Sequence, residues 1–124
     1  MHFFITGGCG FLGSNLAREA LRRGHKLTVF DNLSRLGSSE NLIWLKTFGD
    51  FNFIQADIQK ADDVDKALLL SNPDIIFHLA GQVAMTTSLK EPRQDFEINV
   101  LGTINLLESL RISPALLMPT SKTP

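Results

Sequence analysis

Residues 1–13 read M-H-F-F-I-T-G-G-C-G-F-L-G, and this stretch decides the fold. Residues 2–6 form a short apolar run that glycines stop at once, which is typical of a buried parallel strand. From residue 11 to residue 23 apolar side chains recur at helical spacing, and Gly24 supplies a C-terminal stop. A strand, a glycine-rich turn and a helix in this order predict the first unit of an alternating α/β fold.

The turn carries three glycines at the spacing G-x-x-G-x-x-G, namely Gly7, Gly10 and Gly13. The first permits a tight turn with positive φ, the second lets the backbone approach a pyrophosphate, and the third permits close packing of helix on strand. The phosphate charge would then meet free N–H groups at the positive end of the helix dipole. A glycine motif alone also fits a plain turn, so the function depends on the residues around it.

A carboxylate ends the second predicted strand, which covers residues 26–31. Asp31 stands 18 residues past Gly13, where an acid can bind the ribose hydroxyls of adenosine. Its charge would repel the 2′-phosphate of NADP, whereas Arg35 is able to accept that phosphate. We therefore expect NAD as the cofactor, with NADP as the alternative.

The rest of the chain continues the alternation of strands and helices. Further strands are predicted over residues 51–56 and 74–79, a loop over 33–39, and helices over 40–48, 62–70 and 92–111. Such alternation implies right-handed crossovers and a parallel sheet. The expected fold class is therefore α/β, the amino-terminal part of a Rossmann-type doubly wound parallel sheet.

Two further strand ends point to the same crevice, because ligands of open α/β sheets bind at the carboxyl ends of the strands. Asp57 follows the third strand, where a carboxylate can bond an adenine amino group, although a helix or turn cap is nearly as good an interpretation. Residues 79–82 follow the fourth strand and include small residues that let the backbone lie against a ligand. A plain strand-to-loop turn also explains Ala80 and Gly81.

The composition describes an ordinary globular chain of 124 residues, 44% hydrophobic and 20% charged, with a net charge of −1. Its basic residues are scattered, so we expect neither nucleic acid nor an acidic membrane as a partner. The single cysteine excludes an internal disulfide and favours a reducing, cytoplasmic setting. No apolar run is long enough to predict a transmembrane helix, and the three histidines are too scattered along the chain to suggest a metal site.

Several runs together resemble the extended short-chain dehydrogenase/reductase family, the nucleotide-sugar epimerases and dehydratases. They are T-G-G-C-G-F-L-G at 6–13, V-F-D-N-L-S-R at 29–35, A-D-I at 56–58, F-H-L-A-G-Q-V-A at 77–84 and D-F-E-I-N-V-L-G-T-I-N-L-L-E at 95–108. The resemblance extends to about Arg111. Within the family, the runs D-N-L-S-R and G-Q-V-A-M-T-T-S are most similar to the 2-epimerases of CDP-linked sugars.

The resemblance implies which part of NAD each matching residue contacts. The pyrophosphate would be held by Gly7, Gly10, Phe11, Leu12 and Gly13. The adenosine ribose would be surrounded by Asp31, Asn32, Ser34 and Arg35, and the adenine by Asp57 and Ile58. The nicotinamide side would be lined by Leu79, Ala80, Gly81 and Gln82. Asn99 matches a family asparagine that supports the active-site strand, and an ordinary helix-surface amide is the alternative.

The family's catalytic residues have no counterpart here. In such enzymes NAD takes a hydride from the sugar while an ionised tyrosine, assisted by a lysine, removes a proton, and the hydride returns to the other face. This chain contains no tyrosine, hence no Tyr-x-x-x-Lys. Thr120 and Ser121 match the family's serine-rich strand end only out of register, and Pro119 would interrupt a fifth strand. We assign no catalytic residue.

We therefore expect residues 1–111 to form an NAD-binding Rossmann part and residues 112–124 to be an atypical tail, produced by truncation or a lost reading frame. The expected function is the NAD-binding portion of a nucleotide-sugar epimerase, inactive alone, with a nucleotide sugar as substrate of the complete enzyme. One alternative is a non-catalytic NAD-binding or regulatory module, and another is a fragment of an NADP-dependent sugar-nucleotide reductase or dehydratase. The apolar face of the 92–111 helix would serve as a homodimer interface.

Overall fold

The structure is a computed structural model that describes residues 1–81 and 89–112. Its strands form one sheet in the order β3-β2-β1-β4, and every neighbouring pair is parallel. The strands are β1 (His2–Thr6), β2 (Lys26–Asp31), β3 (Asn52–Gln55) and β4 (Ile75–His78). Because parallel neighbours need crossover connections, helices lie between consecutive strands. This is the α/β, Rossmann-type sheet that the sequence predicts.

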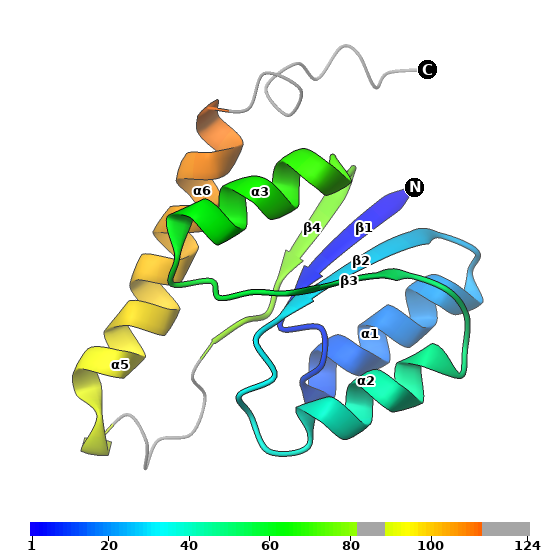
Figure 1. The fold of residues 1–124 in the computed structure, drawn as a ribbon, viewed down its shortest axis with the longest axis horizontal. Coiled ribbons are helices and arrows are strands. Elements are labelled where there is room, and N and C mark those ends of the chain that lie inside the picture. Colours follow the sequence, from blue (N-terminus) through cyan, green and yellow to red (C-terminus); the bar gives the residue numbers. More distant parts are fainter. Residues whose placement is uncertain (82–88, 113–124) are drawn as a thin grey trace.

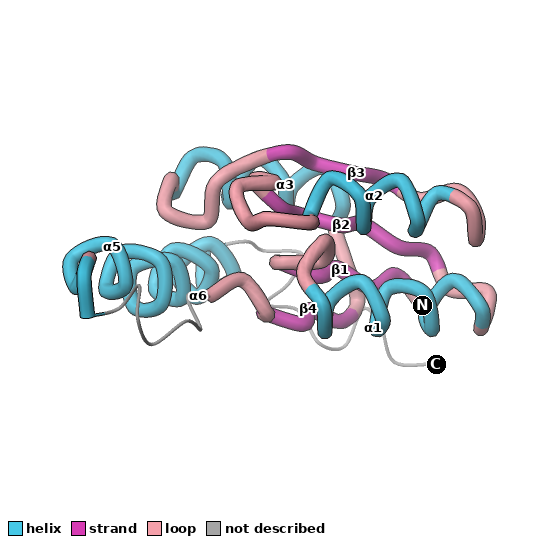
Figure 2. Tube along the Cα trace, turned by 90° about the horizontal axis from the view of Figure 1, so that it is seen from below, coloured by secondary structure: helices cyan, strands magenta, loops and turns pink. Residues whose placement is uncertain are grey.

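Helices cover both faces of the sheet, which gives three layers (Figures 1 and 2). One face carries α1 (Phe11–Arg22) and α2 (Ser38–Lys46). The other face carries α3 (Ala61–Ser71) and the helical segment from Pro92 to Ile112. In the described part of the chain, no helix is long and apolar enough to cross a membrane.

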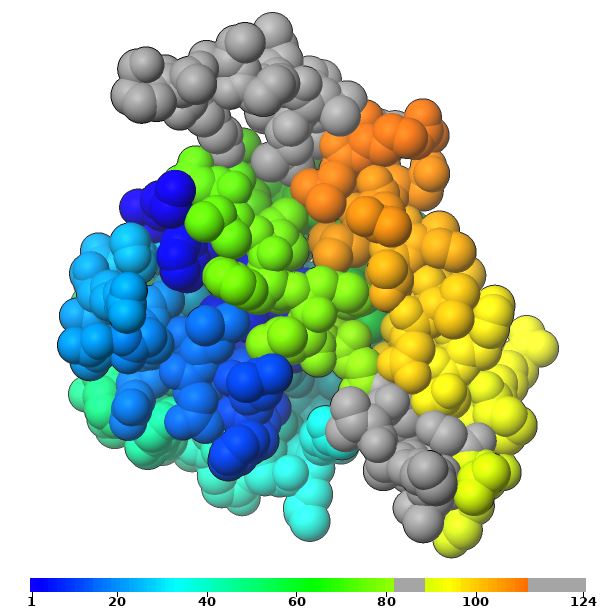
Figure 3. Space-filling model, turned by 180° about the vertical axis from the view of Figure 1, so that it is seen from behind, coloured from blue at the N-terminus to red at the C-terminus, as the bar shows by residue number. Residues whose placement is uncertain are grey.

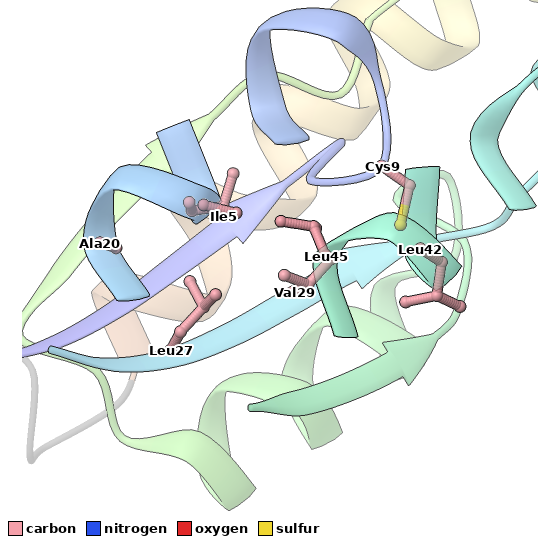
Figure 4. Close-up of a cluster of buried hydrophobic side chains, with 8 residues drawn as sticks. Ile5, Cys9, Ala20, Leu27, Val29, Leu42 and Leu45 are labelled. Atoms are coloured by element: carbon pink, nitrogen blue, oxygen red, sulfur yellow. The ribbon is translucent and has the colours of Figure 1, made fainter. Parts of the chain in front are cut away.

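The central strands are buried on both faces because successive side chains point to opposite sides of a sheet. Ile5 and Val29 face α1 and α2, while the neighbouring Phe4 and Phe30 face α3 and the 92–112 segment. The first cluster is drawn in Figure 4, and its buried members are Ile5, Cys9, Ala17, Ala20, Leu27, Val29, Leu42 and Leu45. The second consists of Phe4, Phe30, Ile58, Val64, Ala67, Leu68 and Leu106. The glycine turn therefore projects from a rigid, fully covered pair of strands.

The predicted bounds of β1 and β2 are confirmed residue for residue, and the other elements shift by one or two residues. The predictions for α2 (40–48) and for the preceding loop (33–39) were wrong at their shared boundary, because α2 begins at Ser38. Gly37 precedes it in the left-handed region, with φ of 88°, and Ser38 bonds back to the Arg35 carbonyl through both its amide (3.1 Å) and its hydroxyl (2.7 Å). These local bonds form the first turn before the apolar pattern starts.

The uniform helix predicted over 92–111 was also wrong in detail. The segment begins as α5 (Pro92–Phe96), widens into a π-helical turn, η1 (Glu97–Leu101), and continues as α6 (Gly102–Ile112). The Thr103 hydroxyl donates to the Asn99 carbonyl at 2.6 Å, a side-chain bond that competes with the regular backbone ladder at this turn. Figure 3 shows this segment, yellow to orange, alongside the strand and loop around residues 75–81, in lime green.

Residues 115–118, which could start a fifth strand before Pro119, and nearly all of the predicted tail lie outside the described residues. The division of the chain at residue 111 therefore stays a prediction.

Candidate functional site

A cleft of about 350 Å³ opens where the strands end at their carboxyl sides. Each strand contributes to it through the residues that follow it: the glycine turn after β1, residues 31–35 after β2, residues 56–59 after β3 and residues 79–81 after β4. Four parallel strands place their carboxyl ends at one edge, so segments far apart in sequence converge there. Residues from the 92–101 helical segment close one side.

The first and third glycines of the motif are required by the protein's own packing. Gly7 has φ of 69°, and a Cβ on it would lie 2.7 Å from the Ala80 amide nitrogen. A Cβ on Gly13 would overlap the Gly7 carbonyl oxygen. These two glycines therefore bring the end of β4 and the start of α1 close to the turn.

The second glycine is different, because the protein itself hardly restricts it. Gly10 has an ordinary extended backbone (φ −76°, ψ 179°), and a Cβ there would meet only the Gly7 carbonyl oxygen, at 3.3 Å. Gly10 also lines the cleft.

Helix α1 starts at this point with an electrostatically positive end. Gly10 is the N-cap residue, no side-chain hydrogen bond caps it, and the first turn holds no acidic residue. The first N–H groups of a helix lack partners within the helix, and together with the helix dipole they attract an anion. The donor set and the open space at Gly10 fit a pyrophosphate.

Cys9 connects the glycine turn to β2 and α2 through hydrogen bonds. Its side chain is fully buried, its amide donates to Asp31 Oδ2 (3.0 Å), and its carbonyl accepts from Asn41 Nδ2 (2.8 Å). Burial, with a smaller contribution from the nearby Asp31 charge, raises the pKa of the Cys9 thiol to about 12. The thiol therefore stays protonated and unreactive at neutral pH.

Asp31 also organises the turn after β2. Its second oxygen, Oδ1, accepts the amide of Leu33 at 2.8 Å, and Leu33 takes the left-handed region with φ of 60°. Asn32 Oδ1 accepts the Ser34 amide at 3.0 Å. The carboxylate is thus held in one rotamer at the cleft, where its remaining lone pairs can accept from ribose hydroxyls.

The turn-cap interpretation of Asp57 is confirmed, and its contact with an adenine stays a prediction. Its Oδ1 accepts the Gln59 amide at 2.9 Å, which is the turn-capping role, yet Asp57 also lines the cleft. The carbonyl of the next residue, Ile58, accepts from Asn105 Nδ2 of α6 at 3.0 Å. The loop after β3 is therefore fixed from both sides.

A hydrogen-bonded chain supports the loop after β4. Thr103 donates its hydroxyl proton to the Asn99 carbonyl, so it accepts from His78 Nε2 (3.1 Å). His78 Nδ1 is then the acceptor for the Thr6 hydroxyl (2.7 Å), whose oxygen in turn accepts the amides of Leu79 (3.0 Å) and Ala80 (3.1 Å). Burial lowers the pKa of His78, in agreement with a neutral ring. His78 is therefore a structural residue.

The cleft gathers most of the residues predicted for the cofactor. Those that line it are Gly7, Gly10, Asp31, Asn32, Ser34, Arg35, Asp57, Ile58, Leu79, Ala80 and Gly81. Phe11, Leu12 and Gly13 are not among the residues that line it; they form the first turn of α1, with Phe11 85% exposed. Gln82 lies outside the described residues, and the roles of all these side chains stay predictions.

Asn99 is placed beside the loop after β4 and does not line the cleft. A Cβ on Gly81 would lie 3.0 Å from its Oδ1, and its Nδ2 donates to Asp95 Oδ1 at 3.0 Å. Its predicted role, which is to support the active-site strand, stays a prediction.

Sequence reasoning missed several residues that line the cleft: Phe30, Ser38, Ala56, Gln59, Gln94 and Ile98. Phe30 and Ala56 are sequence neighbours of the predicted site residues Asp31 and Asp57, and this position could have added them to the predicted site. Gln94 and Ile98 carry no sequence signal, because their place depends on how the 92–101 segment packs. Within residues 1–81 and 89–112, no cluster of His, Cys, Asp or Glu could hold a metal.

Residues 4–121 match the family model described as GDP-mannose 4,6 dehydratase. The chain is 59% identical over 111 residues to CDP-paratose 2-epimerase of Salmonella typhi, covering 90% of this chain and 33% of that protein. It is 38% identical over 113 residues to UDP-glucose 4-epimerase of Mycolicibacterium smegmatis, covering 91% of this chain and 36% of that protein.

Solved structures of the same kind share the fold. The UDP-glucose 4-epimerase of Thermus thermophilus, solved in complex with NAD, superposes with a TM-score of 0.78 at 34% identity. The UDP-glucose 4-epimerase of Thermotoga maritima, solved with UDP-glucose, gives 0.80 at 32% identity. Each match covers 90% of this chain and 34% of the other. The chain thus spans about a third of the length of the proteins it resembles.

Proposed function

Since the chain belongs to the GDP-mannose 4,6 dehydratase family, we propose that its cleft binds NAD and forms the cofactor-binding portion of a nucleotide-sugar epimerase. The observation that carries the proposal is the junction of Gly10 with α1, where an uncapped helix N-terminus faces the cleft beside an unfilled side-chain position. In the proposed pose the pyrophosphate lies on residues 10–13, and Asp31 accepts from the adenosine ribose.

The nucleotide sugar that we propose for the complete enzyme is CDP-linked. The supporting observations are the runs D-N-L-S-R at 31–35 and G-Q-V-A-M-T-T-S at 81–88. These runs resemble the sequence of CDP-tyvelose 2-epimerase, which is also called CDP-paratose 2-epimerase. The 59% identity to the Salmonella typhi protein agrees with this substrate class. Residues 82–88 lie outside the described residues, so the proposal rests on sequence.

The chemistry that NAD would supply is reversible removal of a hydride from a sugar carbon. The present residues would bind and orient it: the turn at 7–13 holds the pyrophosphate, and the loop at 79–81 supports the nicotinamide end. Proton transfer by a tyrosine is not available within these 124 residues, which contain none. We therefore propose that they bind NAD without turnover on their own.

A second candidate is a non-catalytic NAD-binding or regulatory module, a function that requires no tyrosine. Both candidates require the same cofactor site, and they differ in whether an added catalytic portion completes an active enzyme. The third candidate, an NADP-dependent reductase or dehydratase fragment, requires Arg35 to outweigh Asp31. The cytoplasm is the compartment we propose for any of them, as the single, buried cysteine suggests.

Amide NMR of the ¹⁵N-labelled chain tests the proposed pose. On addition of NAD, the shifts should concentrate at residues 10–13, at 31–35 and at 56–59, because the first segment starts α1, where the pyrophosphate is proposed to bind, and the other two contribute residues to the cleft. Shifts that fall elsewhere, or none at millimolar NAD, would refute the cofactor site.

We further propose that the 92–112 segment forms a homodimer interface. Its outer face is an apolar stripe at helical spacing, of which Phe96 (53%), Ile104 (47%) and Leu107 (58%) are well exposed. Sedimentation of the wild-type chain and of an Ile104→Glu, Leu107→Glu variant should show a dimer that the substitutions convert to a monomer. A wild-type chain that stays monomeric at high concentration would end this proposal.

A further inference from the structure

One peptide plane of the glycine turn is held at both of its ends. The plane joins Cys9 to Gly10, the N-cap residue of α1. Its carbonyl, on Cys9, accepts from Asn41 Nδ2 at 2.8 Å, and its N–H, on Gly10, donates to the Gly7 carbonyl at 3.1 Å. The plane therefore holds Gly10, which caps α1 and lines the cleft, from its amino side.

The bond from Asn41 comes from another layer of the fold. Asn41 lies in the first half of α2, and Leu42 and Leu45 of the same helix are buried in the cluster that also contains the Cys9 side chain (Figure 4). Cys9 is fully buried, so water cannot easily replace a lost donor at its carbonyl. Removal of the Asn41 amide would leave that carbonyl to turn toward another donor.

We propose that Asn41 is a positioning residue for the pyrophosphate, acting through the Cys9–Gly10 peptide plane. This inference rests on the proposed function, because it assumes that residues 10–13 receive the pyrophosphate of NAD. The adenosine half should be insensitive to Asn41. Asp31 Oδ2 does accept the Cys9 amide, but that N–H belongs to the Gly8–Cys9 peptide, and Asp31 Oδ1 is held separately by the Leu33 amide. Asp57 and Ile58 are fixed by bonds to Gln59 and Asn105.

The test compares two ligands on folded variants of the full 124-residue chain. NAD carries the pyrophosphate, whereas adenosine carries only the part that residues 31–35 and 57–58 would contact. Asn41→Asp keeps the shape of the side chain and removes the donor, and Asn41→Leu removes it without adding charge. Asn52→Asp, on the exposed edge of β3, is the matched control for the added charge. Circular dichroism melting identifies the variants that fold.

We expect both Asn41 variants to bind NAD about tenfold or more weakly, while adenosine affinity stays within about twofold and Asn52→Asp matches the wild type. Equal loss of NAD and adenosine affinity would show a general structural role and overturn the inference. So would a loss confined to Asn41→Asp, which would indicate charge repulsion. Unchanged NAD binding in both folded Asn41 variants would also overturn it, with the proposed function intact. A wild-type chain that binds no NAD would instead overturn the proposed function.

Should Asn41→Leu fail to fold, Asn41→Ala replaces it, because alanine also removes the donor without adding charge.

Discussion

At the scale of the residue, the three glycines of one motif are held by different constraints. Gly7 and Gly13 are fixed by contacts inside the protein, through a positive φ or an overlap with neighbouring backbone. Gly10 has a negative φ, a Cβ on it would meet only the Gly7 carbonyl oxygen, and the residue lines the cleft. A motif that reads as one pattern in sequence therefore separates into two glycines that the packing requires and one that it restricts only slightly.

This separation predicts opposite effects for two Gly→Ala substitutions. Gly10→Ala should change the free energy of unfolding by about 1 kcal/mol or less, because its φ suits alanine and only the Gly7 oxygen must move slightly. It should weaken NAD binding at least tenfold. Gly13→Ala should destabilise the chain by at least about 2 kcal/mol, because its Cβ overlaps the Gly7 oxygen. Urea unfolding and NAD titration measure both, and a destabilised Gly10→Ala that still binds NAD would contradict this assignment.

His78 gives a prediction about pH. Burial lowers its pKa in the folded state below the ordinary value of 6.5, so the unfolded chain binds the proton more readily. Its stabilising contribution is thus complete above pH 6.5 and is lost as the pH falls from 6.5 through the lowered pKa. Melting temperatures between about pH 7.5 and pH 5 should decline, and His78→Gln should decline less. An equal decline in both proteins would exclude His78 as the cause.

At the scale of the element, the 92–112 segment has two unlike faces. Leu106 is buried in the cluster with α3, whereas its neighbour Leu107 is 58% exposed on the outer stripe. The inner face also reaches the cleft through Ile98 and bonds the loop after β3 through Asn105. The helix therefore both completes the core and supports two loops of the site.

Two adjacent Leu→Ala substitutions test this arrangement. Leu106→Ala should lower the free energy of unfolding by about 2–5 kcal/mol, because it opens a cavity between α6 and α3. Leu107→Ala should cost about 0.5 kcal/mol or less in the monomer, since its side chain is largely in solvent. Similar losses of unfolding free energy for both variants, measured by urea titration at low protein concentration, would show that the helix is packed differently.

The same scale shows how far sequence patterns reach. The apolar runs at 2–6 and 26–31, which end at Gly7 and Asp31, were enough to predict β1, β2 and the cleft at their carboxyl ends. The start of α2 depends on the bonds from Ser38 to the Arg35 carbonyl. The π-helical turn depends on the bond from Thr103 to the Asn99 carbonyl. Neither set of bonds appears as a periodic pattern of apolar residues in the sequence. Asn41 looks like any polar helix residue until the fold brings it to Cys9.

At the scale of the molecule, four parallel strands bring their loops to one edge, and the two halves of a dinucleotide would meet different loops there. Asp31 and Arg35 both line the resulting cleft. Asp31 is fixed in place by two backbone amides, at 3.0 Å from Cys9 and 2.8 Å from Leu33. A carboxylate so held should discriminate against a 2′-phosphate on the adenosine ribose.

Calorimetric titration of the 124-residue chain with NAD and, separately, with NADP tests the central claim most directly. We predict saturable binding of NAD and at least tenfold weaker binding of NADP, because the fixed Asp31 carboxylate repels the additional phosphate. Absence of heat with millimolar NAD, or tighter binding of NADP than of NAD, would contradict it.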